Sequence, residues 1–168
     1  MRRKARRVIL QALYESDVAG HPVEECLGHV LEDTDLDQEN VAFVTRMSKE
    51  VASAQRALDE TIQRFAPSWP VAQLPSLDRN ILRLAIHELT SAKETPPKVA
   101  INEAVVLAKL FGSEGSPRFV NGVLGSVMTA LEEQKGEANP FPRQEVDGAD
   151  SPTTRPKPRG RAPRGRTR

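Results

Sequence analysis

The 168-residue chain has a single cysteine, and aromatic side chains make up only 4% of it. One cysteine cannot form a disulfide within the chain. The chain also lacks an apolar run approaching the roughly 20 residues of a membrane-spanning helix, and no apolar signal-peptide region follows its basic start. We therefore expect a cytoplasmic protein without membrane contact, and the scarcity of aromatics favours helices over strands.

Patterns typical of catalytic, metal and cofactor sites are also missing. The glycine-containing segment FGSEGS lacks the lysine of a phosphate-binding loop. His21, His29 and His87 have no cysteine or carboxylate spacing typical of a metal site. Glu88 and Glu103 are single acids without a partner motif, so we expect each to bond to a backbone group or an arginine. The sequence thus predicts no enzyme, no metal and no cofactor.

The net charge of +1 conceals a strong segregation of charge. Five cations lie within the first seven residues and seven more within residues 151–168, and neither stretch contains an acid. All 23 acids lie in residues 8–150, together with the remaining 12 cations. Basic segments of this kind usually contact an anionic polymer, most often a nucleic acid.

Apolar side chains recur at helical spacing through most of the chain, and no segment alternates as a strand would. The expected helices span residues 3–19, 22–31, one or two helices within 33–66, 77–92, 98–111 and 117–133. Phe111 is expected on the inward stripe of its helix, which Gly112 ends. The sequence therefore predicts an all-α fold.

A proline-rich connector, residues 67–75, divides the expected helices into two packed subdomains, about 1–67 and 76–133. Together they would form one helical domain over residues 1–133. From residue 134 onward the chain is rich in proline, glycine and arginine and has almost no apolar residues. Such a segment cannot offset the entropy of ordering itself, so we expect residues 134–168 to be a disordered basic tail.

The first helix combines its charges with an aromatic ring and an amide beside the apolar stripe. On a helical wheel, Arg3, Arg7 and Tyr14 fall on one line and Lys4 and Gln11 on the adjoining angle, with Arg2 and Arg6 at the exposed start. Cations hold phosphates, a tyrosine or arginine plane stacks on bases, and an amide bonds to base edges. This combination predicts an RNA-binding surface.

The same cations oppose their own helix. They face the positive end of the macrodipole, and Arg2 with Arg6 and Arg3 with Arg7 are like-charge pairs four residues apart. We therefore expect them to serve RNA binding rather than folding, since a phosphate backbone relieves both penalties.

Three segments resemble the NusB family of transcription antitermination factors, in the family's order: RRKARRVILQALY, LDRNILRLAIHEL and PPKVAINEAVVLAKLFGSEGSPRFVNGVLG. The resemblance runs from about Arg2 to Leu131. It implies an all-helical fold of two three-helix bundles and no catalytic activity. It also implies binding of boxA RNA together with NusE, a ribosomal protein of the small subunit, within the antitermination complex of RNA polymerase on ribosomal RNA operons. Free homodimers occur in the family.

By matched position, the resemblance implies roles for particular residues. The RNA surface would include Arg2, Arg3, Lys4, Arg6, Gln11 and Tyr14, extended by Arg118, Phe119 and Asn121. The NusE surface would include Asp78, Arg79 and Arg83. For Arg79 and Arg83, an ordinary solvated helix face is an equally good interpretation.

Four positions depart from the family pattern: His87, Val106, Gly115 and Gly125 stand where tyrosine, glutamate, an acid and aspartate are usual. Val106 and Leu110 add apolar groups outside the main stripe of their helix. Two other functions also fit the sequence, namely an accessory RNA-binding protein of an RNA-modifying complex and a helical protein–protein adaptor. Specific RNA binding should show a preference for boxA RNA over a scrambled RNA at fixed salt, whereas an adaptor should bind both RNAs alike.

Overall fold

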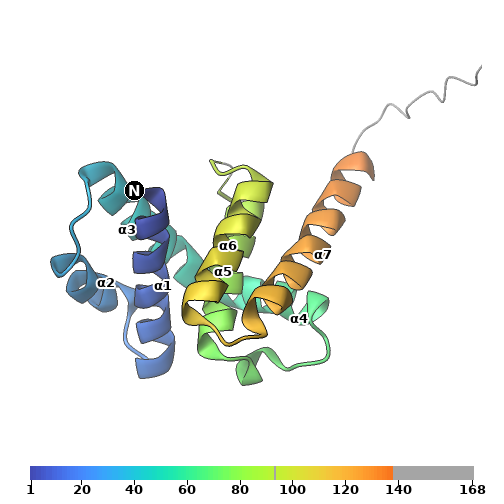
Figure 1. Cartoon of the computed structure of the whole chain (residues 1–168), viewed down its shortest axis with the longest axis horizontal. Helices are drawn as coiled ribbons and strands as arrows, with labels where there is room; N and C mark the ends of the chain where they lie inside the picture. The colour runs from blue at the N-terminus through green and yellow to red at the C-terminus, as the bar shows by residue number, and fades with distance from the viewer. Residues whose placement is uncertain (93, 138–168) are drawn as a thin grey trace, which may run out of the picture. The chain divides into compact units, whose positions relative to one another are not determined.

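A computed structural model describes residues 1–92 and 94–137, so the expected basic tail lies, from residue 138, outside the described residues. The described residues form seven α-helices and one short 3-10 helix, with no strand among them (Figure 1). The α-helices are α1 (Arg2–Ala19), α2 (Val23–Glu32), α3 (Gln38–Ser53), α4 (Gln55–Phe65), α5 (Ser76–Thr90), α6 (Pro97–Phe111) and α7 (Ser116–Glu137). The 3-10 helix, η1 (Val71–Gln73), lies in the connector. The predicted all-α fold is confirmed.

Several helix ends follow directly from their residues. Gly20 ends α1 in the left-handed conformation, with φ 73° and ψ 16°, and its N–H donates to the Ser16 carbonyl at 2.9 Å. The Asp37 side chain caps α3 by accepting from the Asn40 N–H at 2.8 Å. A break at Ala54 divides the expected 33–66 stretch into α3 and α4. At the other end of the chain, α7 continues through Glu137, so residues 134–137 are helical rather than part of the tail.

The helices pack in two groups that meet at α5. Helices α1, α2 and α3 contact one another, as do α5, α6 and α7, while α1 and α3 also pack against α5. In Figure 1 the blue helices α1 and α2 lie to one side of α5 and the orange α7 to the other. Helix α4 contacts α5 and α7 as well as α3. The change between groups therefore falls near Ala54, earlier along the chain than the connector at 67–75.

Helix α5 is the most enclosed element, with every residue from Asn80 to Glu88 buried. Its aliphatic side chains join those of α1, α3 and α7 in one core. Full burial of each such side chain contributes roughly 1.5–3 kcal/mol. Because charged side chains of α5 are buried as well, they require partners on the neighbouring helices.

The connector before α5 is held by two side chains rather than by a core of its own. The Gln63 Nε2 donates to the Trp69 carbonyl at 3.0 Å, and the Gln63 Oε1 accepts from the Val71 N–H at 3.1 Å. The Arg79 Nη1 donates to the carbonyls of Val71, Ala72 and Leu74. These bonds fix the path of the chain between α4 and α5.

In the part of the chain that the structure describes, no helix combines the length and the apolar character needed to cross a membrane.

Candidate nucleic-acid interface

Three of the five cations at the basic end of α1 bond to acids from other helices. The Arg2 guanidinium bonds to Glu39 of α3 at 2.8 Å and lies over the Phe43 ring, 4.1 Å from its centroid. The Lys4 ammonium donates to the Asp35 carbonyl at 2.7 Å, in the loop before α3. These contacts hold the start of α1 against the α2–α3 side of the molecule.

Arg6 is buried and does not reach the exposed surface on which the sequence placed it. Its Nη2 lies 2.7 Å from Glu88 Oε1, and the two side chains are only 5% and 2% exposed. The Arg6 Nη2 also donates to the Thr95 hydroxyl at 3.3 Å. Position 6 faces α5, where the buried carboxylate of Glu88 takes up its charge.

Arg3 pairs with Glu103 of α6 through two bonds. Arg3 Nε lies 3.0 Å from Glu103 Oε2, and Arg3 Nη2 lies 2.8 Å from Glu103 Oε1. Hydrogen bonding from Arg3 lowers the pKa of Glu103, outweighing the opposite effect of burial. The carboxylate is therefore ionised at neutral pH and cancels the charge of Arg3.

These partners correct one inference from the sequence. The cations at the start of α1 were expected to oppose folding, but Arg2, Arg3 and Arg6 each meet an acid from α3, α6 or α5. The acids lie 37 to 100 residues away in the chain. The pattern within α1 alone could not reveal them, because they come from separate helices.

Three further polar residues of α1 form an exposed face. Arg7, Gln11 and Tyr14 are exposed, and Arg7 forms no ion pair within residues 1–92 and 94–137. An open hollow of about 530 Å³ lies against this face. It is lined by Lys4, Arg7, Val8, Leu10, Gln11 and Tyr14 of α1, and by Thr34, Leu77 and Phe111 from other segments.

Phe111 was expected in the core but is 44% exposed. It is the last residue of α6, where the helix ends and no further turn covers the ring. Its ring and that of Tyr14 both line the hollow. Aromatic rings beside cations are side chains of the kind that stack on bases and hold phosphates in RNA-binding proteins.

The three residues implied at the start of α7 follow Phe111 after a short loop. Arg118 and Asn121 are exposed, whereas Phe119 is partly buried and packs against the core. The loop is held by the Ser116 hydroxyl, which accepts from the Ser113 N–H at 2.9 Å. Arg118 and Asn121 are thus accessible on the α7 side of this loop.

The residues implied for NusE lie mainly inside the protein. The side chains of Arg79 and Arg83 are 12% and 5% exposed, and Asp78 is buried. Arg79 pairs with Asp17 at 2.7 Å, and Arg83 pairs with Asp59 at 2.7 Å. A solvated helix face is therefore excluded for both arginines, and a partner would meet only the edge of this network.

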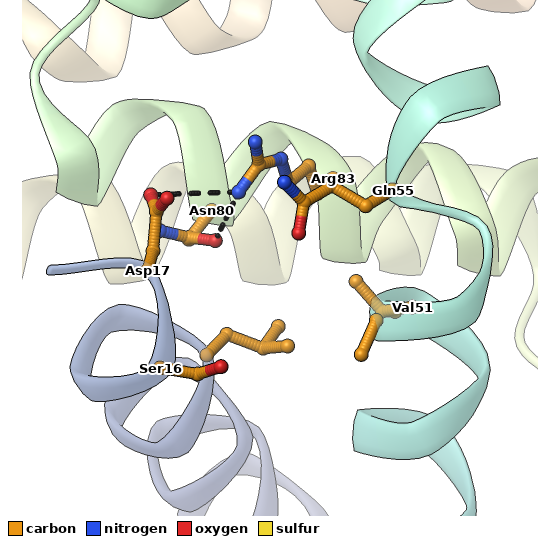
Figure 2. Close-up of a pocket in the computed structure, with 8 residues that line it drawn as sticks. Ser16, Asp17, Val51, Gln55, Asn80 and Arg83 are labelled. Atoms are coloured by element: carbon orange, nitrogen blue, oxygen red, sulfur yellow. Dashed lines mark hydrogen bonds and ion pairs between the residues drawn. The ribbon is translucent and has the colours of Figure 1, made fainter. Parts of the chain in front are cut away.

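Figure 2 shows the centre of this network, beside a small cavity. The volume of the cavity is about 180 Å³. Asp17 of α1 accepts hydrogen bonds from Arg79 and from Asn80. The Arg83 Nη1 lies 3.4 Å from the Asp17 Oδ2. Burial raises the pKa of Asp17, but hydrogen bonds from Arg79 and Asn80 and the nearby arginine charges outweigh it and lower the pKa overall. The carboxylate thus stays charged and ties α1 to α5.

No group of three or more histidine, cysteine or acidic side chains among the described residues is placed to hold a metal ion. His87 instead pairs with Glu50 of α3, with Nε2 2.8 Å from Oε2.

These features define a class: an all-α protein of two helical groups meeting at one buried helix, with a cationic and aromatic face on its first helix. The model of the NusB family matches residues 3–129. The chain belongs to the NusB family.

Relatives and solved structures agree with this assignment. The transcription antitermination protein NusB of Dehalococcoides mccartyi strain CBDB1 is 53% identical over 130 residues, covering 77% of this chain and 91% of that protein. NusB of Roseiflexus castenholzii is 43% identical, covering 80% and 96%. Among solved structures, T. maritima NusB matches with a TM-score of 0.73 and 29% identity, covering 80% of this chain and 97% of that one. A chain from a crystal structure of the antitermination factors NusB and NusE in complex with double-stranded RNA matches with a TM-score of 0.71 and 25% identity, covering 77% and 96%.

Proposed function

We propose that the protein is an RNA-binding transcription antitermination factor that binds boxA RNA together with NusE. It acts in the cytoplasm, within the antitermination complex of RNA polymerase, and promotes processive transcription of ribosomal RNA operons. It works by binding rather than by catalysis. The observation that carries the proposal is the exposed face of α1, where Lys4, Arg7, Gln11 and Tyr14 surround a hollow that also contains Phe111.

Each part of this face has a role in binding single-stranded RNA. Lys4 and Arg7 neutralise phosphates, Tyr14 and Phe111 stack on unpaired bases, and Gln11 bonds to a base edge. Arg118 and Asn121 extend the face at the start of α7, where backbone N–H groups also favour phosphate. Arg6 takes part only indirectly, by fixing α1 against α5.

The NusE surface is proposed near the start of α5. Because Asp78 and Arg83 are buried and the Arg79 side chain is only 12% exposed, we assign to the two arginines the role of holding α5 and its connector in the shape that NusE recognises. A homodimer of the free protein would compete with RNA if it covered the α1 face.

Fluorescence anisotropy of a short labelled boxA RNA against a scrambled control tests the proposal. The measurement is made with and without NusE, at two salt concentrations. We expect boxA to bind more tightly at each salt concentration and NusE to tighten it further. Equal binding of both RNAs in every condition would refute the antitermination function and direct the search to an adaptor role with protein partners.

A further inference from the structure

The exposed cations of α1 differ in how much charge they present to solvent. Lys4 bonds to a neutral carbonyl, and Arg7 has no ion pair in the described part of the chain, so no acid among the described residues offsets either charge. Arg3 shares its charge with Glu103. The stripe that holds Arg3 and Arg7 therefore combines a neutralised guanidinium with a fully charged one.

The Arg3–Glu103 pair is oriented as well as neutral. Two bonds, from Nε and Nη2, fix the plane of the guanidinium against the carboxylate. The Arg3 side chain is 54% exposed, whereas Glu103 is only 12% exposed. Of the five N–H groups of an arginine, three remain to donate outward from a fixed plane.

Folding alone gives a weak reason for this arrangement. Ion pairs at the protein surface usually contribute less than about 1 kcal/mol to stability, and the Arg3 side chain is more than half exposed. The buried Arg6–Glu88 pair already fixes α1 nearby. The Arg3–Glu103 pair does supply a rigid set of donors at the edge of the α1 face.

We propose that Glu103 is a positioning residue for RNA recognition, holding Arg3 as an oriented hydrogen-bond donor and stacking plane for a base instead of a phosphate counter-charge. This inference rests on the proposed function. Arg3 then contributes to the choice of RNA sequence, whereas Lys4 and Arg7 contribute most of the salt-dependent affinity of α1.

Substitution Glu103→Gln tests the inference, because it removes the negative charge beside Arg3 and weakens the two hydrogen bonds that hold the guanidinium. We expect the slope of log affinity against log salt for scrambled RNA to steepen by about 0.7, the value for one more phosphate of a single strand. We also expect the preference for boxA over scrambled RNA to fall several-fold. A merely structural pair would not move these two quantities in opposite directions.

Glu60→Gln is the matched control, since it makes the same change of charge and breaks an exposed pair with Arg56 on α4. Its slope and its boxA preference should stay at the wild-type values. If Glu103→Gln behaves like this control, the positioning role is wrong.

Arg3→Lys provides a second test that does not depend on the folding of the Glu103 variant. It keeps the positive charge but removes the planar guanidinium that forms two bonds to Glu103. The preference for boxA should therefore fall several-fold, and the salt slope should stay unchanged. A preserved preference would overturn the inference. If the wild-type protein itself bound the two RNAs alike, the proposed function would fail. If the wild-type protein preferred boxA and that preference survived both substitutions, only the positioning role of Glu103 would fail.

Discussion

The buried pair of Arg6 and Glu88 gives the sharpest prediction for a single side chain. Arg6→Ala should lower the free energy of unfolding by about 3–5 kcal/mol, because it leaves the carboxylate of Glu88 buried and uncompensated. Urea unfolding followed by circular dichroism measures the loss. A double variant, Arg6→Met with Glu88→Leu, should be far less destabilised, since it removes both charges. Equal losses in the single and the double variant would contradict this account.

Arg7 should behave in the opposite way, because it is exposed and has no ion pair in the described residues. Arg7→Gln should leave the free energy of unfolding within about 0.5 kcal/mol of wild type. It should reduce the magnitude of the salt slope of RNA binding by about 0.7. Lys49→Gln, an equal change of charge at an exposed position of α3, is the control. If the two variants had the same salt slope of RNA binding, Arg7 would not be part of the RNA surface.

How far individual side chains could be predicted depended on the number of helices involved. The wheel of α1 placed Arg7, Gln11 and Tyr14 correctly on an exposed face, because these positions lie on the side of α1 that the neighbouring helices leave open. It failed for Arg6, whose environment is set by Glu88, 82 residues later. For Glu88 the sequence left a backbone group or an arginine open as the partner, and the structure shows the arginine.

Two glycines offer a contrast between the end of a helix and its interior. Gly20 ends α1 with φ 73°, so Gly20→Ala should destabilise the protein by about 1 kcal/mol through backbone strain alone. Gly28 is exposed within α2, with no atom near the site of an added methyl group. Gly28→Ala should therefore stabilise by about 0.5–1 kcal/mol. Thermal unfolding of both variants checks the opposite signs, and a shift in the same direction would contradict the assignment.

The existence of the helices followed from apolar spacing, but their ends and grouping did not always follow. The expected ends of the first helix at residue 19 and of the helix before Gly112 at residue 111 are confirmed. The break at Ala54 carries no proline or glycine signal, and α4 turns there to contact α5 and α7. Whether residues 33–66 form one helix or two depends on packing between distant segments, so the sequence alone left both possibilities open.

The link between α1 and α5 predicts how the protein responds to acid. The folded state lowers the pKa of Asp17, so its stabilising effect is complete above the ordinary pKa of about 3.9 and is lost as the pH falls through the lower folded value. Asp17→Asn should be less stable than wild type at neutral pH and should lose less stability below about pH 4. Urea midpoints from pH 7 to pH 3 measure this, with Glu114→Gln, at an exposed loop residue, as the control. Parallel acid profiles for wild type and Asp17→Asn would contradict it.

The basic segment at the end of the chain should act on RNA through its charge. Residues 151–168 carry seven cations and no acid, which adds sequence-independent attraction to phosphates. Deleting residues 138–168, which leaves α7 whole, should reduce the salt slope and keep the preference for boxA. Anisotropy with boxA and scrambled RNAs compares the two chains. Loss of the preference would show that the segment reads sequence.

The connector at residues 67–75 has a consequence for digestion by proteases. With three prolines and an exposed Trp69, it resembles the flexible link that limited proteolysis usually cuts first. Yet the carbonyls of Val71, Ala72 and Leu74 are bound by Arg79, and that of Trp69 by Gln63. A protease must draw the chain into an extended form, which requires all of these bonds to break together. This stretch should therefore survive digestion intact, and the two helical groups should be recovered as one fragment.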